Sequence, residues 1–355
     1  MQGLPRRVQG QGLPVLIPGA EAAPRRGAAV FVAGASGYIG RALVRELCAR
    51  GHRVVCLVRP RSGVGGRESP ADLARDLPGA ELRVGDVSDP RRLREDGFAG
   101  ETFDAVFSCL ATRGGGIRDA WNVEFEANRV LLDAALAAGV PRFVLLSAIC
   151  VQRPKLAFQQ AKLAFEESLA GSGLAYSIVR PTAFFKSLAG QVPRVLAGKP
   201  YLLFGDGELT ACKPISERDL ARYLADCLDD PARENAVLPI GGPGPALTPR
   251  AMGELLFRLS GRPAHFRSVP PGLFTAVGGA LGTLGRVFPP LLDKAEFARI
   301  GHYYATESML LWDEERGAYD ADATPSFGED TLEGFYGQVL TQGLAGQDLG
   351  DHALF

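Results

Sequence analysis

The chain has 355 residues, of which 46% are hydrophobic and 22% are charged, and its 39 lysines and arginines nearly balance its 40 aspartates and glutamates. This length corresponds to about two domains, or to one enlarged α/β domain, and the near-zero net charge excludes a broadly basic surface for nucleic acid. We expect no membrane-spanning helix, because the uncharged run 273–285 is shorter than the roughly 20 apolar residues required and is rich in glycine.

The two ends of the chain differ in composition from the rest. Residues 1–27 contain four arginines and a single acid, Glu21, among glycine, proline and glutamine. An arginine-rich, acid-poor leader is typical of an organelle transit segment, although a disordered tail has a similar composition. We therefore expect a leader over 1–27 and a tail over 341–355, and we exclude both from the fold.

The cysteines and histidines lack the spacing of a metal site. The chain has six cysteines and four histidines, and no two cysteines form a CxxC pair. Most of the cysteines lie in apolar segments, where small buried residues in a reducing compartment are the usual finding. The sequence therefore predicts neither a metal site nor a disulfide scaffold.

From Ala28 onward, short apolar runs alternate with segments of helical periodicity. Uninterrupted apolar strands separated by helices predict an α/β fold, with a doubly wound parallel sheet of the Rossmann type. Ser216 and Thr248 have the residue type and position of helix N-caps. The predicted strands are 28–33, 53–58, 81–85, 105–109, 143–147, 176–179 and 236–240, and the predicted helices are 39–50, 121–138, 156–170, 217–228 and 250–259.

This pattern divides the chain into two predicted parts. The regular alternation covers 28–240, which we predict to be a nucleotide-binding domain. After Gly241 the chain is richer in glycine, proline and aromatic residues and loses the regular alternation. We predict a smaller C-terminal lobe over 241–340 that covers a substrate.

A glycine-rich turn between the first predicted strand and the first predicted helix gives the strongest local signal. Gly34 permits a tight turn, Gly37 allows close approach of a pyrophosphate, and Gly40 allows the helix to pack on the strand. The amino end of the helix supplies N–H groups for phosphates. The predicted cofactor contacts here are Gly34, Ser36, Gly37, Tyr38, Ile39 and Gly40.

The end of the second predicted strand indicates which dinucleotide binds. No acid stands where the adenine ribose 2′-hydroxyl is held, and Arg59 and Arg61 are there instead. Guanidinium groups suit a 2′-phosphate. The sequence therefore predicts NADPH as the cofactor.

The GxxGxxG spacing resembles that of the short-chain dehydrogenase/reductase superfamily, in its extended or atypical branches. This resemblance implies further cofactor contacts after the third, fourth and fifth strands, where the superfamily holds adenine and the nicotinamide ribose. The implied contacts are Asp86, Val87, Leu110, Ala111 and Ser147.

The superfamily also carries a Tyr-x-x-x-Lys pair, in which the lysine lowers the phenol pKa and binds the nicotinamide ribose. Here Lys162 is present, but Phe158 replaces the tyrosine. Because phenylalanine cannot transfer a proton, the sequence argues against ordinary carbonyl reduction through a tyrosine acid. Two alternatives follow: NADP binding without catalysis, as in a sensor or an assembly factor, or reduction of an activated carbon–carbon double bond.

Long strings in both predicted parts resemble the family of plant- and green-bacterial-type divinyl chlorophyllide a 8-vinyl-reductases. The family's activity implies NADPH-dependent reduction of the C8 vinyl group of 3,8-divinyl chlorophyllide or protochlorophyllide a, a magnesium tetrapyrrole, to ethyl during chlorophyll biosynthesis. It implies a plastid location in a eukaryote or a cytoplasmic one in a bacterium, with peripheral thylakoid contact. The matching strings are 145–151, 176–187, 198–201, 204–207, 211–217, 238–244 and 303–309.

This chemistry accounts for the missing tyrosine. A vinyl group conjugated to a macrocycle accepts hydride at its terminal carbon, and the ring then spreads the negative charge. We predict that Lys162 orients the nicotinamide ribose, and the sequence does not identify the proton donor. Reduction of another conjugated alkene remains open. The predicted substrate contacts at a strand end beside the cofactor are Arg180, Thr182, Phe184, Phe185, Lys186 and Lys213.

Overall fold

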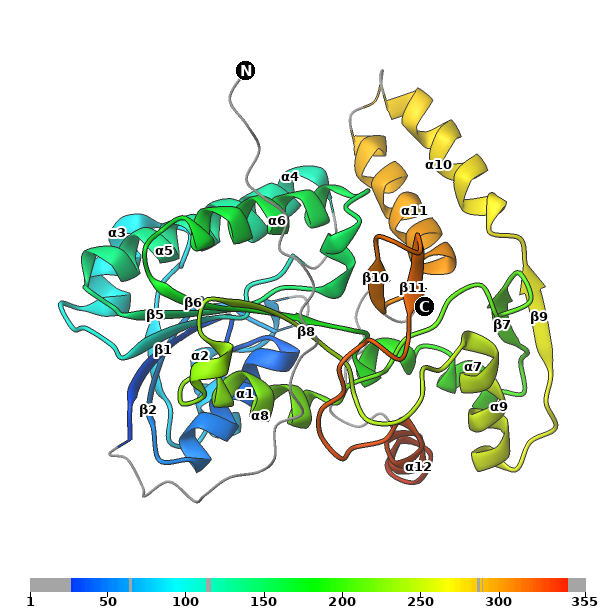
Figure 1. The fold of residues 1–355 in the computed structure, drawn as a ribbon, viewed down its shortest axis with the longest axis horizontal. Helices are drawn as coiled ribbons and strands as arrows, with labels where there is room; N and C mark the ends of the chain where they lie inside the picture. The colour runs from blue at the N-terminus through cyan, green and yellow to red at the C-terminus, as the bar shows by residue number, and fades with distance from the viewer. Residues whose placement is uncertain (1–26, 64–65, 113–115, 286–287, 289, 344–355) are drawn as a thin grey trace.

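The computed structural model describes residues 27–63, 66–112, 116–285, 288 and 290–343 (Figure 1). A seven-stranded parallel sheet forms its centre, in the order β3-β2-β1-β4-β5-β6-β8. The order reverses between β1 and β4, so the doubly wound sheet is confirmed, and a ligand is expected at the carboxyl ends of these strands. The strands are β1 (Ala29–Ala33), β2 (Arg53–Val58), β3 (Glu81–Val84), β4 (Ala105–Ser108), β5 (Arg142–Leu146), β6 (Ala175–Pro181) and β8 (Ala236–Ile240).

Helices cover both faces of the sheet (Figure 1). Side chains alternate along a strand, so Val30 and Val32 of β1 join one core cluster while Phe31 joins the other. The first face carries α1 (Tyr38–Ala49), α2 (Pro70–Asp76) and α8 (Glu217–Asp226), and the second carries α3 (Pro90–Arg92), the π-helical η2 (Leu93–Phe98), α5 (Asn128–Ala137) and α6 (Ala157–Ala170).

The helix predicted over 121–138 is longer than expected and is not uniform. It begins with α4 (Ile117–Ala120), continues as the π-helical η3 (Trp121–Ala127) and ends as α5. Wide π-helical turns often occur at functional sites. This one contains Glu124, which is buried.

The second lobe contains residues from both sides of the predicted boundary at 240. β7 (Tyr201–Phe204) pairs with β9 (Phe266–Val269), so a segment that precedes β8 packs with the C-terminal part. A separate core cluster joins Phe185, Tyr201, Leu256 and Tyr336. The other elements outside the central layers are η4 (Ile149–Gln152), η5 (Phe185–Leu188), α7 (Val192–Leu196), η6 (Pro231–Arg233), α9 (Pro249–Ser260), β10 (Leu311–Asp313), β11 (Ala318–Asp320) and α12 (Leu332–Gln342).

The two predicted N-caps are confirmed. The Ser216 hydroxyl accepts the Asp219 amide at 3.0 Å, and the Thr248 hydroxyl accepts the Ala251 amide at 3.2 Å. Each side chain satisfies an amide that a helix start leaves without an intrahelical partner.

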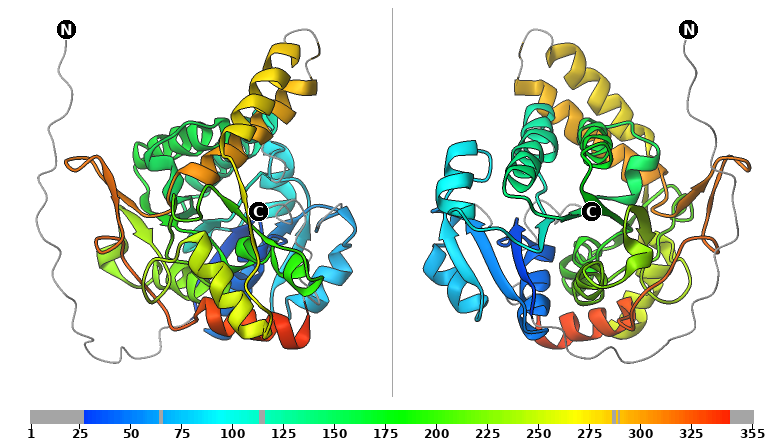
Figure 2. Two further views of the ribbon diagram at one scale, coloured as in Figure 1. Left: turned by 90° about the vertical axis from the view of Figure 1, so that its right-hand side faces the viewer. Right: turned by 60° about the vertical axis from the view of Figure 1, so that its left-hand side comes forward.

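Two helices form a hairpin that projects from the body: α10 (Gly272–Gly285) and α11 (Pro290–Thr306) (Figure 2). The described part of α10 has no charged side chain. Across the described residues, no helix is long and apolar enough to cross a membrane.

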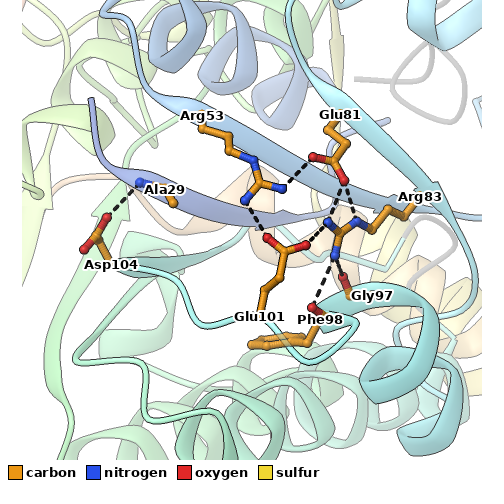
Figure 3. A network of polar contacts seen from close by, with 8 residues as sticks. All are labelled: Ala29, Arg53, Glu81, Arg83, Gly97, Phe98, Glu101 and Asp104. Carbon is orange, nitrogen blue, oxygen red and sulfur yellow. Dashed lines mark hydrogen bonds and ion pairs between the residues drawn. The ribbon is translucent and has the colours of Figure 1, made fainter. Parts of the chain in front are cut away.

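A network of charges lies at the amino ends of the strands, away from the expected ligand edge (Figure 3). Arg53 of β2 donates to Glu81 at 2.7 Å and to Glu101 at 2.6 Å. Arg83 of β3 contacts both carboxylates as well and donates to the Gly97 carbonyl. The network ties β2 and β3 to the turn that precedes β4.

Candidate active site

The glycine turn between β1 and α1 leaves no room for side chains. Gly34 has φ of +84°, and a Cβ atom there would lie 2.5 Å from the Cys109 carbonyl oxygen. A Cβ atom on Gly40 would lie 2.1 Å from the Gly34 carbonyl oxygen. The backbone of β1, the start of α1 and the end of β4 therefore meet at the distance that only glycine allows.

The amino end of α1 is open to an anion. Gly37 is the N-cap and provides no side-chain cap, and the first turn, with Tyr38, Ile39 and Gly40, has no acid. The Ser36 carbonyl accepts the Arg41 guanidinium at 3.1 Å, which fixes the turn before the helix. Free amides and the positive end of the helix dipole match a pyrophosphate.

The side chains of Tyr38, Phe184 and Lys186 lie together. The Lys186 ammonium is 5.1 Å from the centroid of the Tyr38 ring, and the Phe184 ring is 6.4 Å from it. The Tyr38 hydroxyl donates to Glu217 of α8. Burial, together with the Glu217 charge, raises the pKa of the Tyr38 phenol well above its ordinary value.

Arg59 and Arg61 are exposed just beyond the carboxyl end of β2. Within the described ranges, neither guanidinium has a hydrogen-bond or ion-pair partner, so both are available to a 2′-phosphate. Beyond β3, the exposed Asp86 carboxylate accepts the Ser88 amide at 2.9 Å and the Ser88 hydroxyl at 2.7 Å, and Val87 is half-buried. With the glycine turn and the open helix end, this set fits NADPH.

The segment after β4 approaches the same edge of the sheet. Ser108 donates to the Asn128 side chain at 2.5 Å, and Leu110 is half-buried while Ala111 is exposed. The amide of Thr112 donates to Glu124 Oε1 at 2.8 Å. The loop that carries the predicted contacts Leu110 and Ala111 is thus anchored on η3.

Lys162 forms a buried ion pair with Glu124, which the sequence analysis did not identify. The Lys162 Nζ atom lies 2.7 Å from Glu124 Oε2, and the two side chains are 10% and 1% exposed. A buried ammonium requires a compensating charge, so burial of Lys162 implies an acid nearby. The sequence did not predict that Glu124 is this acid, because Glu124 lies in a π-helical turn.

Two predicted contacts, Ser147 and Arg180, belong to a second buried network. The Arg180 Nε atom lies 3.1 Å from both carboxylate oxygens of Glu166, and Ser147 donates to the same carboxylate. The Glu166 side chain is 4% exposed. The charge of Arg180 is thus compensated within the protein, which favours a structural role.

Three further predicted substrate contacts are held by the protein itself. Phe185 is buried against Phe335, with ring centroids 5.4 Å apart. The Lys213 ammonium donates to the Thr324 carbonyl at 2.8 Å, and the Thr182 hydroxyl donates to the Lys213 carbonyl. These contacts join the strand ends to the C-terminal segment, and their role as substrate contacts stays a prediction.

A cavity of about 560 Å³ lies between α10 and α11. This volume is in the range of sites for small molecules. The uncharged run of α10 is visible in the sequence, but no site was predicted there. The lining residues are Leu273, Phe274, Val277, Leu281, Asp293, Lys294, Phe297 and Ala298.

Comparisons with known proteins agree with this arrangement. A family model described as NAD(P)H-binding matches residues 34–231. The solved complex of leucoanthocyanidin reductase with NADPH from Vitis vinifera superposes with a TM-score of 0.63 at 16% identity, covering 88% of this chain and 99% of that one. The fold and the site thus define an NAD(P)H-binding protein of the Rossmann class.

Sequence comparison identifies the family within that class. The chloroplastic divinyl chlorophyllide a 8-vinyl-reductase of Zea mays is 53% identical over 339 residues, which cover 94% of this chain and 84% of the relative. The corresponding reductase of Oryza sativa is 52% identical over 331 residues, covering 92% and 82%. The chain belongs to the divinyl chlorophyllide a 8-vinyl-reductase family.

Proposed function

We propose that this protein reduces the C8 vinyl group of a 3,8-divinyl chlorophyllide to ethyl with NADPH, and that it does so in the plastid. The observation that carries this proposal is the identity of about half of all residues with chloroplastic reductases over nearly the whole chain, both lobes included. The function is thus inferred from the second lobe as well as from the part with the NAD(P)H-binding fold.

The residues around Lys162 suit the reduction of a conjugated alkene. Phe158 lies one helical turn before Lys162 and cannot donate a proton, so it cannot act as the acid that a carbonyl oxygen requires. NADPH, when bound, supplies a hydride to the vinyl group. The chain's own tasks are to hold the dinucleotide at the glycine turn and arginines, to place Lys162 beside it, and to exclude bulk water.

The substrate is a broad, largely apolar macrocycle, and the cavity between α10 and α11 offers matching walls. Phe274 and Phe297 face it with aliphatic neighbours, while Lys294 supplies a cation for a propionate. We propose that the macrocycle enters along this cavity. Phe184 and Lys186, beside Tyr38, would contact its reacting end.

The projecting hairpin also supports peripheral contact with the thylakoid membrane. Leu273, Val277 and Leu284 of α10 are exposed, and Phe288 beyond α10 is exposed as well. An exposed apolar helix without charges is typical of contact with an apolar phase. The adjoining cavity would then receive a pigment dissolved in the membrane.

The test is anaerobic incubation of the purified protein with NADPH and 3,8-divinyl chlorophyllide a, followed by chromatographic separation of divinyl and monovinyl pigments. We expect the monovinyl product with NADPH and little with NADH. NADPH binding in a parallel titration without any product would instead favour a sensor or an assembly factor. Turnover of a simpler conjugated alkene alone would favour a different reductase.

A further inference from the structure

The two helices that bring Lys162 and Glu124 together begin at residues that cannot cap them. Helix α6 carries Lys162, and α4 leads directly into η3, which carries Glu124. The N-cap residues are Gly116 for α4 and Leu156 for α6, and neither makes a side-chain cap hydrogen bond. Because the first amides of a helix have no intrahelical partner, another part of the chain or water must satisfy them.

Helix α11 of the second lobe supplies both missing caps with two carboxylates. Asp293 Oδ1 accepts the amide of Ile117, the first residue of α4, at 3.2 Å. Glu296 Oε1 accepts the amide of Ala157, the first residue of α6, at 2.9 Å. Residues three apart share one face of a helix, and a carboxylate is favourable at the positive end of a helix dipole. Helix α11 therefore lies across the amino ends of α4 and α6 (Figure 1).

The two carboxylates differ in their surroundings. Glu296 is only 3% exposed, and its Oε2 atom lies 3.1 Å from the Arg299 guanidinium. A buried carboxylate is costly unless charge and hydrogen bonds compensate it, so the Ala157 amide and Arg299 are specific partners of Glu296. Asp293 lies nearer to solvent and lines the cavity between α10 and α11.

These contacts lie close to the buried ion pair along each helix. Lys162 is five residues beyond Ala157, about 7 Å along the axis of α6. Glu124 is seven residues beyond Ile117, on the other helix that α11 caps. The distance of 2.7 Å between Lys162 Nζ and Glu124 Oε2 requires a fixed separation of these two helices. One rigid helix attached to both amino ends sets that separation.

We propose that Asp293 and Glu296 are positioning residues for the Lys162–Glu124 pair. They attach α11 to both helices of the pair, so Lys162 takes its place beside the cofactor only when the second lobe is docked. This proposal rests on the proposed function, in which Lys162 orients the nicotinamide ribose. Since Asp293 also lines the cavity, the helix that receives the pigment is the helix that places the lysine.

The test is a single turnover of the full chain. Enzyme loaded with one equivalent of NADPH is mixed anaerobically with excess 3,8-divinyl chlorophyllide a, quenched at intervals, and the pigments are separated by chromatography. The amplitude of monovinyl product measures the fraction of competent enzyme, and the rate constant measures the reaction itself. A loss of folded protein lowers the amplitude alone, whereas a misplaced Lys162 lowers the rate constant.

Glu296→Leu removes the cap of α6 and should lower the rate constant by about 10- to 100-fold, because small displacements of reacting groups have effects of this size. The Kd for NADPH should stay within about twofold. Glu296→Gln keeps an oxygen that can accept the Ala157 amide and should restore the rate constant to within about threefold of wild type. Asp293→Ala should lower the rate constant as well and should raise KM for the pigment, because Asp293 lines the cavity.

Thr248→Val is the matched control, because it removes an N-cap hydroxyl from α9 of the same lobe. It should lower the melting temperature and keep the wild-type rate constant. If Glu296→Leu does not fold, Glu296→Asp retains the charge but draws the carboxylate back by one methylene, and it should also lower the rate constant.

Three results would overturn the positioning role and leave the proposed function intact. The first is a wild-type rate constant in the folded Glu296 variants. The second is a loss of amplitude alone, and the third is a Glu296→Gln variant as slow as Glu296→Leu. Absence of monovinyl product from the wild type would instead refute the proposed function itself.

Discussion

The Lys162 ammonium and the Glu124 carboxylate form a buried ion pair across α6 and η3, with Nζ 2.7 Å from Oε2. Glu124 also accepts the Thr112 amide at 2.8 Å, so the loop after β4 is tied to the same carboxylate. Lys162 is therefore positioned by an acid and not by a tyrosine partner one turn before it. We predict that the pair holds this cation where it can orient the nicotinamide ribose.

Substitution of Lys162 should distinguish its contribution to stability from its contribution to turnover. Lys162→Met leaves the buried Glu124 carboxylate without a compensating charge, which costs about 3–5 kcal/mol of stability. The double variant Lys162→Met/Glu124→Gln removes both charges and should recover most of that stability. Turnover should stay at least about 100-fold below wild type in both variants, because neither holds a cation at the cofactor.

The comparison needs thermal unfolding and steady-state kinetics on the same preparations. Lys199→Met, which removes an exposed ammonium of the second lobe, is the control and should match wild type in both. If the double variant regained wild-type turnover, Lys162 would have only a structural role.

Arg59 and Arg61 should determine the choice between NADPH and NADH. Replacing both with alanine removes the cations for a 2′-phosphate, and charge-assisted contacts to such groups contribute about 1.5–3 kcal/mol each. We expect KM for NADPH to rise at least about tenfold and KM for NADH to change little. Arg258→Ala, an exposed arginine on α9, controls for loss of surface charge. An equal effect on both dinucleotides would argue against a 2′-phosphate contact.

The glycine turn predicts a steric effect that depends on position. Gly40→Ala places a Cβ atom 2.1 Å from the Gly34 carbonyl oxygen, so α1 must move away from β1. We expect loss of NADPH binding in a fluorescence titration and a lower melting temperature. Gly337→Ala in α12 meets nothing within 4 Å and should leave binding unchanged, with stability equal or slightly increased. Normal binding by Gly40→Ala would contradict the close packing described here.

Sequence reasoning predicted the central sheet because its strands are short apolar runs between helices, and β2 and β8 have the predicted bounds. The glycine turn could also be predicted, because Gly34 and Gly40 are required by the local backbone geometry. The contact of Glu124 with Lys162 could not be predicted, because Glu124 lies in a π-helical turn. The sequence predicted a smaller lobe over 241–340 but not its pairing with an earlier segment, since β7 pairs with β9, about 60 residues later in the chain. Contacts across that distance leave little local pattern.

The projecting hairpin should bind lipid if it contacts the thylakoid surface. Leu284→Glu combined with Phe288→Glu places two charges on its exposed apolar face. We expect flotation with vesicles of thylakoid lipid composition to fall several-fold relative to wild type, while turnover of detergent-dispersed substrate is retained. Leu209→Glu, at an exposed leucine of the second lobe, is the control. Equal flotation of all three proteins would exclude this hairpin as the contact.

The charge network at the amino ends of the strands should make stability depend on acid pH. Hydrogen bonds from Arg53, and then from Arg83, lower the pKa of Glu101 from 4.5 to about 2 (Figure 3). A carboxyl whose pKa is depressed by folding stabilises the protein above its unfolded pKa, and this stabilisation is lost as pH falls from about 4.5 towards 2. Glu101→Gln should therefore be less stable at neutral pH and should lose less stability across that interval. Urea unfolding at a series of pH values measures this, with the exposed Glu167→Gln as control. If Glu101→Gln and wild type lost equal stability on acidification, the network would not hold the Glu101 carboxylate as described.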